Sequence, residues 1–321
     1  MLEFYWIIMH GSAKPTKSRA PRNRTIDVLA GERDELRSQL IFDPDKSDPA
    51  IRNKICCGDA FQILVDLPAA GFDLLFTDPP YNLRKIFGKE NFSELTSDEY
   101  EVWLESWLLL CVPLLKPTAS VYICGDWRSS SAIQRVGSKY FKLQNRITWE
   151  REKGRGAKAN WKNSAEDIWF FTVSDKFTFN LDAVKIRRKV LAPYKENGQP
   201  KDWKASEKGN FRDTHPSNIW TDISVPFWSM PENTDHPTQK PEKLLAKIIL
   251  ASTNPGDLIL DPFAGSCTTA VAAKKLGRDF VAIESDENYC LLAQKRLEMA
   301  ETDKSIQGFA DGVFWERNSG K

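Results

Sequence analysis

Residues 258–286 read LILDPFAGSCTTAVAAKKLGRDFVAIESD. An apolar run ends in Asp261, a turn of small residues follows, and a helix-like segment begins at Thr268. Strand, helix and a second strand in this order predict two parallel strands with a connecting helix. Small residues let a ligand approach the backbone, and the helix start offers unpaired N–H groups. The second strand ends in Glu284, an acid that can bind a ribose diol, so the stretch predicts a nucleotide-type site.

The same alternation runs through most of the chain. We expect strands at about 53–59, 72–76, 119–124, 141–150, 166–174, 258–263 and 279–284. We expect helices at about 60–69, 97–115, 128–138, 240–252, 268–276 and 286–301. Ser97 is the expected N-cap of the second helix. This order predicts a doubly wound α/β fold, with a mostly parallel sheet between two layers of helices.

One internal stretch breaks the alternation. Residues 175–235 lose their periodicity and gain Pro, Asn, Gly, Lys and Trp. We interpret them as an insertion between two parts of the main domain, residues 51–174 and 236–302. Residues 1–50 are then an N-terminal extension with a basic arm, and residues 303–321 a C-terminal tail.

Composition limits the class of protein. With 321 residues, 41% hydrophobic and 28% charged, the chain is typical of soluble globular proteins. It contains no apolar run of the roughly 18 residues that a membrane helix needs. Six cysteines without a CxxC pair and three scattered histidines favour a reducing cytoplasm and argue against a metal site.

Basic residues are unevenly distributed, although the net charge is only +1. Residues 14–24 contain five bases and no acid, and bases outnumber acids across residues 151–212. Aromatic residues such as Trp161, Trp203 and Phe211 are interleaved with these bases. This combination favours a face that binds nucleic acid over one that is merely solvated.

A second turn combines residues in an unusual way. The apolar run FDLLF, residues 72–76, is followed after Thr77 by Asp78, Pro79, Pro80 and Tyr81. Proline cannot donate to a sheet ladder, so the strand must end here in a stiff turn. In α/β proteins, ligands bind in the crevice outside the carboxyl ends of strands.

Together these turns resemble those of the DNA amino-methyltransferases that use S-adenosylmethionine. DPPY, residues 78–81, is similar to their catalytic motif, and DPFAGSCTT, residues 261–269, to their cofactor motif. HPTQKPEKLL, residues 236–245, is similar to an element that precedes the cofactor strand. The motif order resembles the beta group of the family, which implies a circularly permuted methyltransferase fold with an inserted target-recognition region. Cys267 departs from the pattern, because the family usually has a second glycine there.

The resemblance implies a chemical role for the DPPY turn. The exocyclic amino nitrogen of a base is a poor nucleophile, because its lone pair is delocalised into the ring. The Asp78 carboxylate and the Pro79 carbonyl would accept its two N–H bonds and stabilise the positive charge that grows during transfer. Pro80 would keep the turn rigid, and Tyr81 would stack on the base. The target base must leave the duplex to reach such a site. The alternatives without a catalytic role are that Asp78 is a turn or helix-cap aspartate and that Tyr81 packs in the core.

The resemblance also implies a set of cofactor-binding residues. Its members are Asp59, Thr238, Lys240, Asp261, Phe263, Ala264, Gly265, Ser266 and Glu284. Glu284 would bind the ribose, Thr238 and Lys240 the carboxylate of the cofactor, and Asp59 its adenine region. Asp261 would shape the turn. Helix capping is the alternative for Asp59, Thr238 and Lys240, and a surface acid is the alternative for Glu284.

Expected DNA contacts form a third set: Trp149, Lys153, Arg155, Lys158, Lys162, Arg187, Arg188 and Arg212. Trp149 lies where the family often has an aromatic residue beside the flipped base, although core packing explains it equally well. KGRGAKANWKN, residues 153–163, is expected to be a basic loop that contacts phosphates. The three arginines are expected to influence which sequences are modified.

The leading hypothesis is a site-specific DNA methyltransferase that modifies adenine N6, because the aspartate form of the motif is commoner in adenine enzymes. Cytosine N4 is the first alternative, followed by RNA or protein amino methylation and by an inactive DNA-binding relative. A nicotinamide oxidoreductase would leave DPPY without a role. The expected cofactor is S-adenosylmethionine and the expected partner is double-stranded DNA, with no metal or membrane. A homodimer, a cytoplasmic location at the nucleoid and a restriction-modification context are compatible with this hypothesis.

Overall fold

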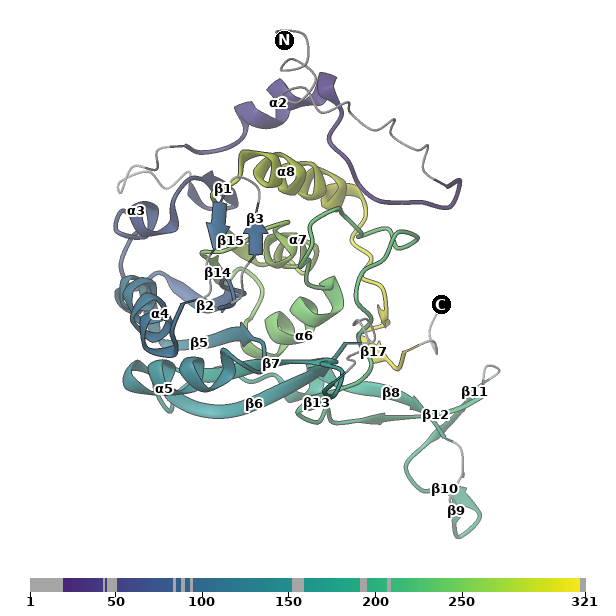
Figure 1. Ribbon diagram of the computed structural model, residues 1–321. Coiled ribbons are helices and arrows are strands. Elements are labelled where there is room, and N and C mark those ends of the chain that lie inside the picture. The colour runs from purple at the N-terminus through teal and green to yellow at the C-terminus, as the bar shows by residue number, and fades with distance from the viewer. Residues whose placement is uncertain are drawn as a thin grey trace, which may run out of the picture.

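A mixed sheet of eight strands forms the centre of the computed structural model (Figure 1). The structure describes residues 20–42, 44, 51–82, 85–87, 90–92, 95–151, 159–190, 195–206 and 209–317. In spatial order the strands are β1 (Lys54–Cys57), β15 (Asp279–Glu284), β14 (Leu258–Asp261), β2 (Phe72–Thr77), β5 (Leu115–Gly125), β7 (Ala165–Thr172), β6 (Lys142–Glu150) and β13 (Ile219–Trp220). The strands from β1 to β5 are mutually parallel, whereas β7 runs antiparallel to both of its neighbours.

Helices cover both faces of this sheet, as predicted for an α/β fold. Strand side chains point alternately to the two faces, so a strand buried on both sides is apolar throughout. Leu74 and Phe76 belong to one core with α6 (Glu242–Ser252), α7 (Thr268–Lys275) and α8 (Glu287–Thr302). Phe72 and Leu75 belong to the opposite core, with α3 (Ala60–Leu64), α4 (Ser97–Cys111) and α5 (Ser130–Tyr140). Amino-terminal to these elements, α2 (Arg33–Ser38) reaches α8 through an ion pair between Arg37 and Glu287.

Several helix boundaries differ from the predicted ones. The N-cap of α4 is Thr96 and not Ser97, because Thr96 and Glu99 exchange hydrogen bonds in a capping box. The α-helix ends at Cys111, and a 3₁₀ turn with Pro113 follows it. Pro113 has no backbone N–H to donate to a carbonyl in the preceding turn, so the α-helical hydrogen-bond pattern cannot continue through it. Helix α3 also ends early, at Leu64.

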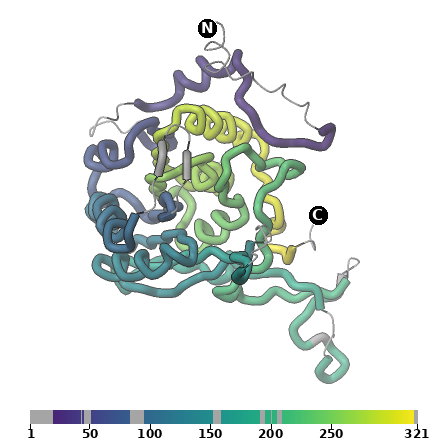
Figure 2. Tube along the Cα trace, viewed as in Figure 1, coloured from purple at the N-terminus to yellow at the C-terminus, as the bar shows by residue number. Residues whose placement is uncertain are grey.

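The inserted residues form a second, smaller sheet that projects from the body (Figures 1 and 2). Its order is β11 (Lys204–Ser206), β12 (Gly209–Thr214), β8 (Ile186–Lys189), β17 (Val313–Trp315) and β16 (Phe309–Ala310). Two short hairpins are separate from this sheet. One pairs β9 (Lys195–Glu196) with β10 (Gln199–Pro200) within the insertion, and the other pairs β3 (Lys85–Phe87) with β4 (Glu90–Phe92) between β2 and α4. Because β17 pairs with β8, the C-terminal segment and the insertion share one sheet, while β13 joins the central sheet.

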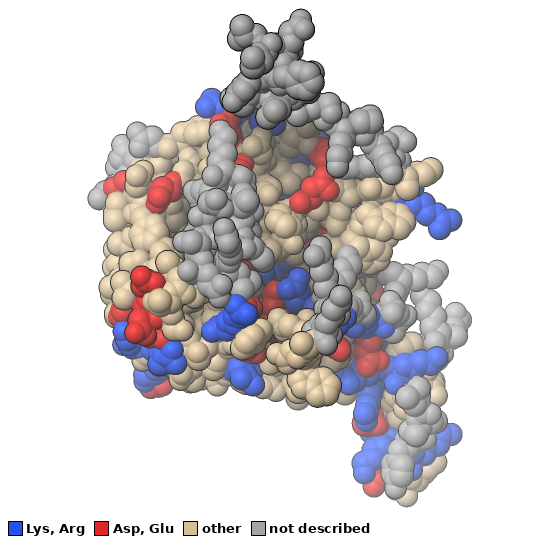
Figure 3. All heavy atoms as spheres, in the orientation of Figure 1, with Lys and Arg blue, Asp and Glu red and all other residues tan. Residues whose placement is uncertain are grey.

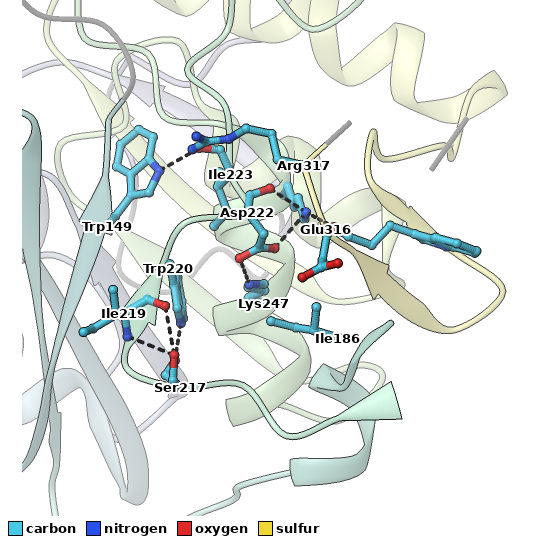
Figure 4. Close-up of polar contacts among 12 residues, drawn as sticks. Trp149, Ile186, Ser217, Ile219, Trp220, Asp222, Ile223, Lys247, Glu316 and Arg317 are labelled. Atoms are coloured by element: carbon cyan, nitrogen blue, oxygen red, sulfur yellow. Dashed lines mark hydrogen bonds and ion pairs between the residues drawn. The ribbon is translucent and has the colours of Figure 1, made fainter. Parts of the chain in front are cut away.

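A buried charged cluster of Asp222, Lys243 and Lys247 links the C-terminal segment to α6 (Figure 4). Lys247 Nζ donates to Asp222 Oδ1 at 2.6 Å and lies 4.9 Å from the ring centroid of Trp220. Lys243 Nζ lies 2.8 Å from Asp222 Oδ2 and donates to the Trp315 carbonyl at 2.5 Å. Burial lowers the pKa of Lys247 to about 8, although the Asp222 charge opposes this shift. One carboxylate therefore compensates two buried ammonium groups.

No helix within the described ranges is long and apolar enough to cross a membrane. All six cysteines are free and buried.

Candidate functional site

A cavity of about 240 Å³ lies at the carboxyl ends of β1, β15, β14 and β2. These strands are parallel neighbours, so the residues that follow them meet at one edge of the sheet. All predicted catalytic and cofactor residues line this cavity: Asp59, Asp78, Pro79, Pro80, Tyr81, Thr238, Lys240, Asp261, Phe263, Ala264, Gly265, Ser266 and Glu284. The structure thus brings the two turns together, while the role of each residue stays a prediction.

The DPPY turn is held by its own side chains and by one lysine. Tyr81 donates its hydroxyl to Asp78 Oδ1 at 2.6 Å, and Lys240 Nζ forms an ion pair with Asp78 Oδ2. Lys240 Nζ also lies 3.3 Å from the Tyr81 hydroxyl oxygen. Burial, and then the charges of Asp78 and Glu166, raise the pKa of Tyr81 well above its usual value. Tyr81 therefore stays a neutral donor that orients the carboxylate.

A second carboxylate lies behind Lys240, and sequence reasoning missed it. Glu166 Oε2 is 3.3 Å from Lys240 Nζ, and Glu166 Oε1 pairs with Arg151. The side chains of Lys240 and Glu166 are 7% and 4% exposed. Burial lowers the pKa of Lys240, but the charges of Asp78 and then Glu166 outweigh it, so its pKa is raised and it stays charged. The available signal was an acid near the start of the apolar strand EDIWFF.

Lys240 was expected to bind the carboxylate of the cofactor. In the structure its ammonium lies against the catalytic turn, because Asp78 and Glu166 flank it inside the protein. Its neighbour Thr238 donates its backbone N–H to His236 Nδ1 at 3.4 Å. Only the role of Lys240 in ordering Asp78 follows directly from these contacts.

The turn after β14 has a backbone that only small residues tolerate. Gly265 has φ +54°, and a Cβ there would lie 2.9 Å from His236 Cε1. Cys267 is also left-handed, with φ 60° and ψ 37°. A non-glycine residue in this region costs about 1–2 kcal/mol, which explains why the family usually has glycine there. The Cys267 thiol is fully buried in the core, and that packing offsets part of the cost.

The acids of the cavity are oriented by backbone amides. Glu284 accepts hydrogen bonds from Gly265 N at 2.8 Å and Asp286 N at 2.9 Å, and burial raises its pKa. Asp261 accepts from Phe263 N at 3.2 Å and from the Thr269 hydroxyl at 2.5 Å, and burial raises its pKa to about 7. These contacts show Asp261 shaping the turn.

Asp59 caps α3, because it accepts from Phe61 N at 2.6 Å and Gln62 N at 3.4 Å. The capping alternative therefore describes its contacts, although the residue also lines the cavity.

Charge in the cavity is predominantly negative. Its lining includes the carboxyl groups of Asp59, Asp78, Asp261, Glu284 and Asp286, against one ammonium, that of Lys240; Asp261 is only partly ionised at neutral pH, because its pKa is about 7. His236 adds no positive charge near neutral pH, because burial and then Lys240 lower its pKa to about 4. The cavity therefore favours a ligand that carries positive charge.

The predicted DNA contacts are scattered over the molecule. Trp149 is 1% exposed and donates its indole N–H to the Ile223 carbonyl at 3.0 Å (Figure 4). Core packing is therefore the interpretation that its contacts support, and a contact with a flipped base stays a prediction. Lys162 is exposed, whereas Lys153, Arg155 and Lys158 lie outside the described residues.

The three arginines of the small sheet each face a carboxylate. Arg187 binds Asp213 through two hydrogen bonds of 2.8 Å, and Arg212 binds Asp202 at 3.1 Å. Arg188 lies 3.8 Å from Glu316. Lys and Arg gather on this projecting sheet with acids between them (Figure 3). A role in DNA binding would require phosphates or bases to compete with these acids.

Comparison with known proteins places this site in context. Residues 72–295 match the family model for N6/N4 methyltransferases, described as DNA methylase. The DNA adenine methyltransferase YhdJ of Escherichia coli K12 is 36% identical, over 76% of this chain and 82% of that protein. The Type II methyltransferase M.HpaI of Haemophilus parainfluenzae is 33% identical, over 80% of this chain and 76% of that protein.

Solved structures of similar chains agree in fold. The M1.HpyAVI–SAM complex superposes with a TM-score of 0.52 at 26% identity, covering 76% of this chain and 98% of that chain. The PvuII cytosine-N4-specific DNA methyltransferase gives a TM-score of 0.54 at 19% identity, covering 77% and 91% of the two chains, and shows the fold alone.

Proposed function

Because the chain belongs to the N6/N4 DNA methylase family, we propose that it transfers a methyl group from S-adenosylmethionine to N6 of adenine in duplex DNA. The observation that carries this proposal is the meeting of the DPPY turn and the turn after β14 at one cavity. The relative that is named a DNA adenine methyltransferase, together with the aspartate at position 78, favours adenine over cytosine.

The residues present fit S-adenosylmethionine, which supplies the methyl group when bound. Its sulfonium carries positive charge, and the cavity is lined by one ammonium and five carboxyl groups, of which Asp261 is only partly ionised at neutral pH. Glu284 accepts two backbone N–H bonds, and a carboxylate has about four acceptor sites, so it retains capacity for a ribose diol. Gly265 allows the turn its positive φ and its close packing against His236 at the cavity wall.

The chain's own residues then act on the target base. Asp78 accepts an N–H of the amino group and draws the nitrogen lone pair out of conjugation. As the nitrogen bonds to the methyl carbon it becomes positive, and a fixed carboxylate stabilises that charge most in the transition state. Asp78, which accepts that N–H, can also take the proton that the methylated nitrogen must lose. Tyr81 holds the carboxylate in place through its 2.6 Å hydrogen bond.

Mass spectrometry of nucleosides tests the proposal directly. Purified protein is incubated with duplex DNA and S-adenosylmethionine, and the DNA is then digested to nucleosides. N6-methyldeoxyadenosine is the expected product. N4-methyldeoxycytidine would assign the same site to cytosine, and methylation of RNA alone would overturn the DNA substrate. Cofactor binding without any transfer would identify an inactive relative.

Glu284→Ala is expected to weaken S-adenosylmethionine binding about 10-fold or more, because a charge-assisted hydrogen bond contributes roughly 1.5–3 kcal/mol. A ribose contact serves ground and transition states alike, so KM should rise while kcat falls less than about threefold. Titration calorimetry measures the affinity. Glu287→Ala is the matched control, since Glu287 pairs with Arg37 at the surface. Unchanged affinity in Glu284→Ala would make Glu284 a purely structural acid.

Replacing the bases of the predicted phosphate loop, Lys153, Arg155, Lys158 and Lys162, with alanine is expected to weaken binding to any duplex. The slope of log K against log salt should flatten by up to about 3–4, with the preferred sequence unchanged. Fluorescence anisotropy on a cognate and a random duplex at three salt concentrations measures it. Lys274→Ala with Lys304→Ala is the control, because α7 and α8 end at the opposite edge of the sheet. An equal slope in both variants would contradict the phosphate contacts.

The wider context is part of the same proposal. Residues 175–235 would serve as the target-recognition region of a circularly permuted methyltransferase, with Arg187, Arg188 and Arg212 influencing sequence choice. DNA methylation would place the protein in the cytoplasm at the nucleoid, and the Type II name of M.HpaI favours a link to restriction. Homodimerisation stays a prediction that light scattering can test.

A further inference from the structure

Glu166 has a buried oxygen with acceptor capacity to spare. Its Oε2 accepts no hydrogen bond from the part of the chain that the structure describes, although the side chain is only 4% exposed. Lys240 Nζ lies 3.3 Å from this oxygen in an ion pair without hydrogen-bond geometry. Buried acceptors are rarely left unused, so this atom calls for an explanation.

Both oxygens of the Asp78 carboxylate, in contrast, already have partners. Asp78 Oδ1 accepts the Tyr81 hydroxyl, and Asp78 Oδ2 is paired with Lys240. A target amino group that binds Oδ2 must share this oxygen with the ammonium. An ammonium beside the reacting nitrogen also opposes the positive charge that grows there during methyl transfer. The arrangement seen here therefore orients Asp78 but does not leave it ready for the reaction.

We propose that Glu166 is a positioning residue that takes Lys240 from Asp78 when the target amino group binds, an inference that rests on the proposed function. A shift of less than about 1 Å would bring Nζ to normal hydrogen-bond distance from Glu166 Oε2. The contact of Lys240 with Asp78 Oδ2 then lengthens, so that Oδ2 can also accept the amino N–H, and the ammonium moves away from the developing charge. Arg151 holds the other oxygen of Glu166, which keeps Oε2 directed at Lys240.

The charges of the four residues make this exchange feasible. Asp78, Lys240, Glu166 and Arg151 alternate in sign, so moving Lys240 between its two partners leaves the group of four neutral. The two carboxylates together keep Lys240 protonated, and its raised pKa agrees with this. Lys240 consequently acts as a mobile counter-charge and not as a proton acceptor.

A double-mutant cycle with Glu166→Gln and Lys240→Met tests the inference. Glutamine keeps the shape but offers Lys240 no charge, so Lys240 stays on Asp78. Glu166→Gln should lower the single-turnover methylation rate about 10- to 100-fold, with KM for S-adenosylmethionine and Kd for DNA changed less than about threefold. In the Lys240→Met background there is nothing to move, and the same substitution should change the rate less than about threefold.

Two further variants complete the design. Glu166→Asp retains a carboxylate and should recover most of the rate that glutamine loses. If Lys240→Met is inactive, this comparison tests whether the charge of Glu166 is needed to position Lys240. Glu150→Gln is the control at the end of β6, since Glu150 is half-exposed and lies 3.8 Å from Arg317.

The outcomes separate the two proposals. A wild-type protein that methylates no nucleic acid would overturn the proposed function. An active wild type in which Glu166→Gln has no effect, acts equally in both Lys240 backgrounds, or is not improved upon by Glu166→Asp would overturn the role of Glu166 alone.

Discussion

Asp78→Asn is expected to lower kcat for methyl transfer at least about 100-fold while leaving the affinity for S-adenosylmethionine within about threefold. Asparagine keeps the shape of the side chain but loses the negative charge. The lost charge acts on the target nitrogen, whose positive charge exists only in the transition state, so kcat carries the effect. A 100-fold loss corresponds to roughly 2.7 kcal/mol, which is reasonable for one charge-assisted acceptor in a buried site.

Single-turnover methylation and titration calorimetry measure the two quantities separately. Asp73→Asn is the matched control, because Asp73 lies at the other end of β2 and pairs with Lys116 away from the cavity. Asp78→Ala should behave like Asp78→Asn in rate but be less stable, since alanine also removes the side-chain oxygens that face Tyr81 and Lys240. Activity of Asp78→Asn within threefold of the parent protein would rule out the acceptor role.

The location of this site was predictable, because each of its acids can be placed at the end of a strand from the neighbouring sequence alone. Asp59, Asp78, Asp261 and Glu284 each end or follow an apolar run, and the alternation of runs and helices predicts parallel strands. Carboxyl ends of neighbouring parallel strands share an edge, so the acids had to lie near one another. Which strands are neighbours, and so how near the acids lie to one another, was known only from the structure.

Contacts within the site were not predictable in the same way. Lys240 was assigned to the cofactor from its motif, whereas its partners come from β2 and β7. Nothing in the sequence around Glu166 marks it as the neighbour of a lysine in a distant segment, because the pairing depends on the three-dimensional path of the segment that contains Lys240.

The C-terminal segment was likewise expected to be a tail, and its strand β17 pairs with β8 of the insertion. Short strands with few residues carry too little periodicity to be recognised.

Asp222→Asn is expected to lower the free energy of unfolding by about 3–5 kcal/mol, the largest stability effect that we expect from a single substitution. It would leave Lys243 and Lys247 buried without their carboxylate, and removing one partner of a buried pair leaves an uncompensated charge. Urea denaturation followed by tryptophan fluorescence measures the change. Asp202→Asn is the control, because its pair with Arg212 is half-exposed and should contribute less than about 1 kcal/mol.

The pH dependence identifies the cause of this loss. The pKa of Lys247 is lowered from 10.5 to about 8 in the folded protein, so the unfolded chain binds more protons between these values. The unfolding free energy contributed by Lys247 therefore rises with pH across that window. Without Asp222 the folded pKa of Lys247 should fall further, and the rise should begin below pH 8. The deficit of Asp222→Asn should consequently be large at pH 7 and smaller at pH 9.5. A deficit that is the same at both pH values would mean that lost packing, and not the unpaired ammonium, causes the destabilisation.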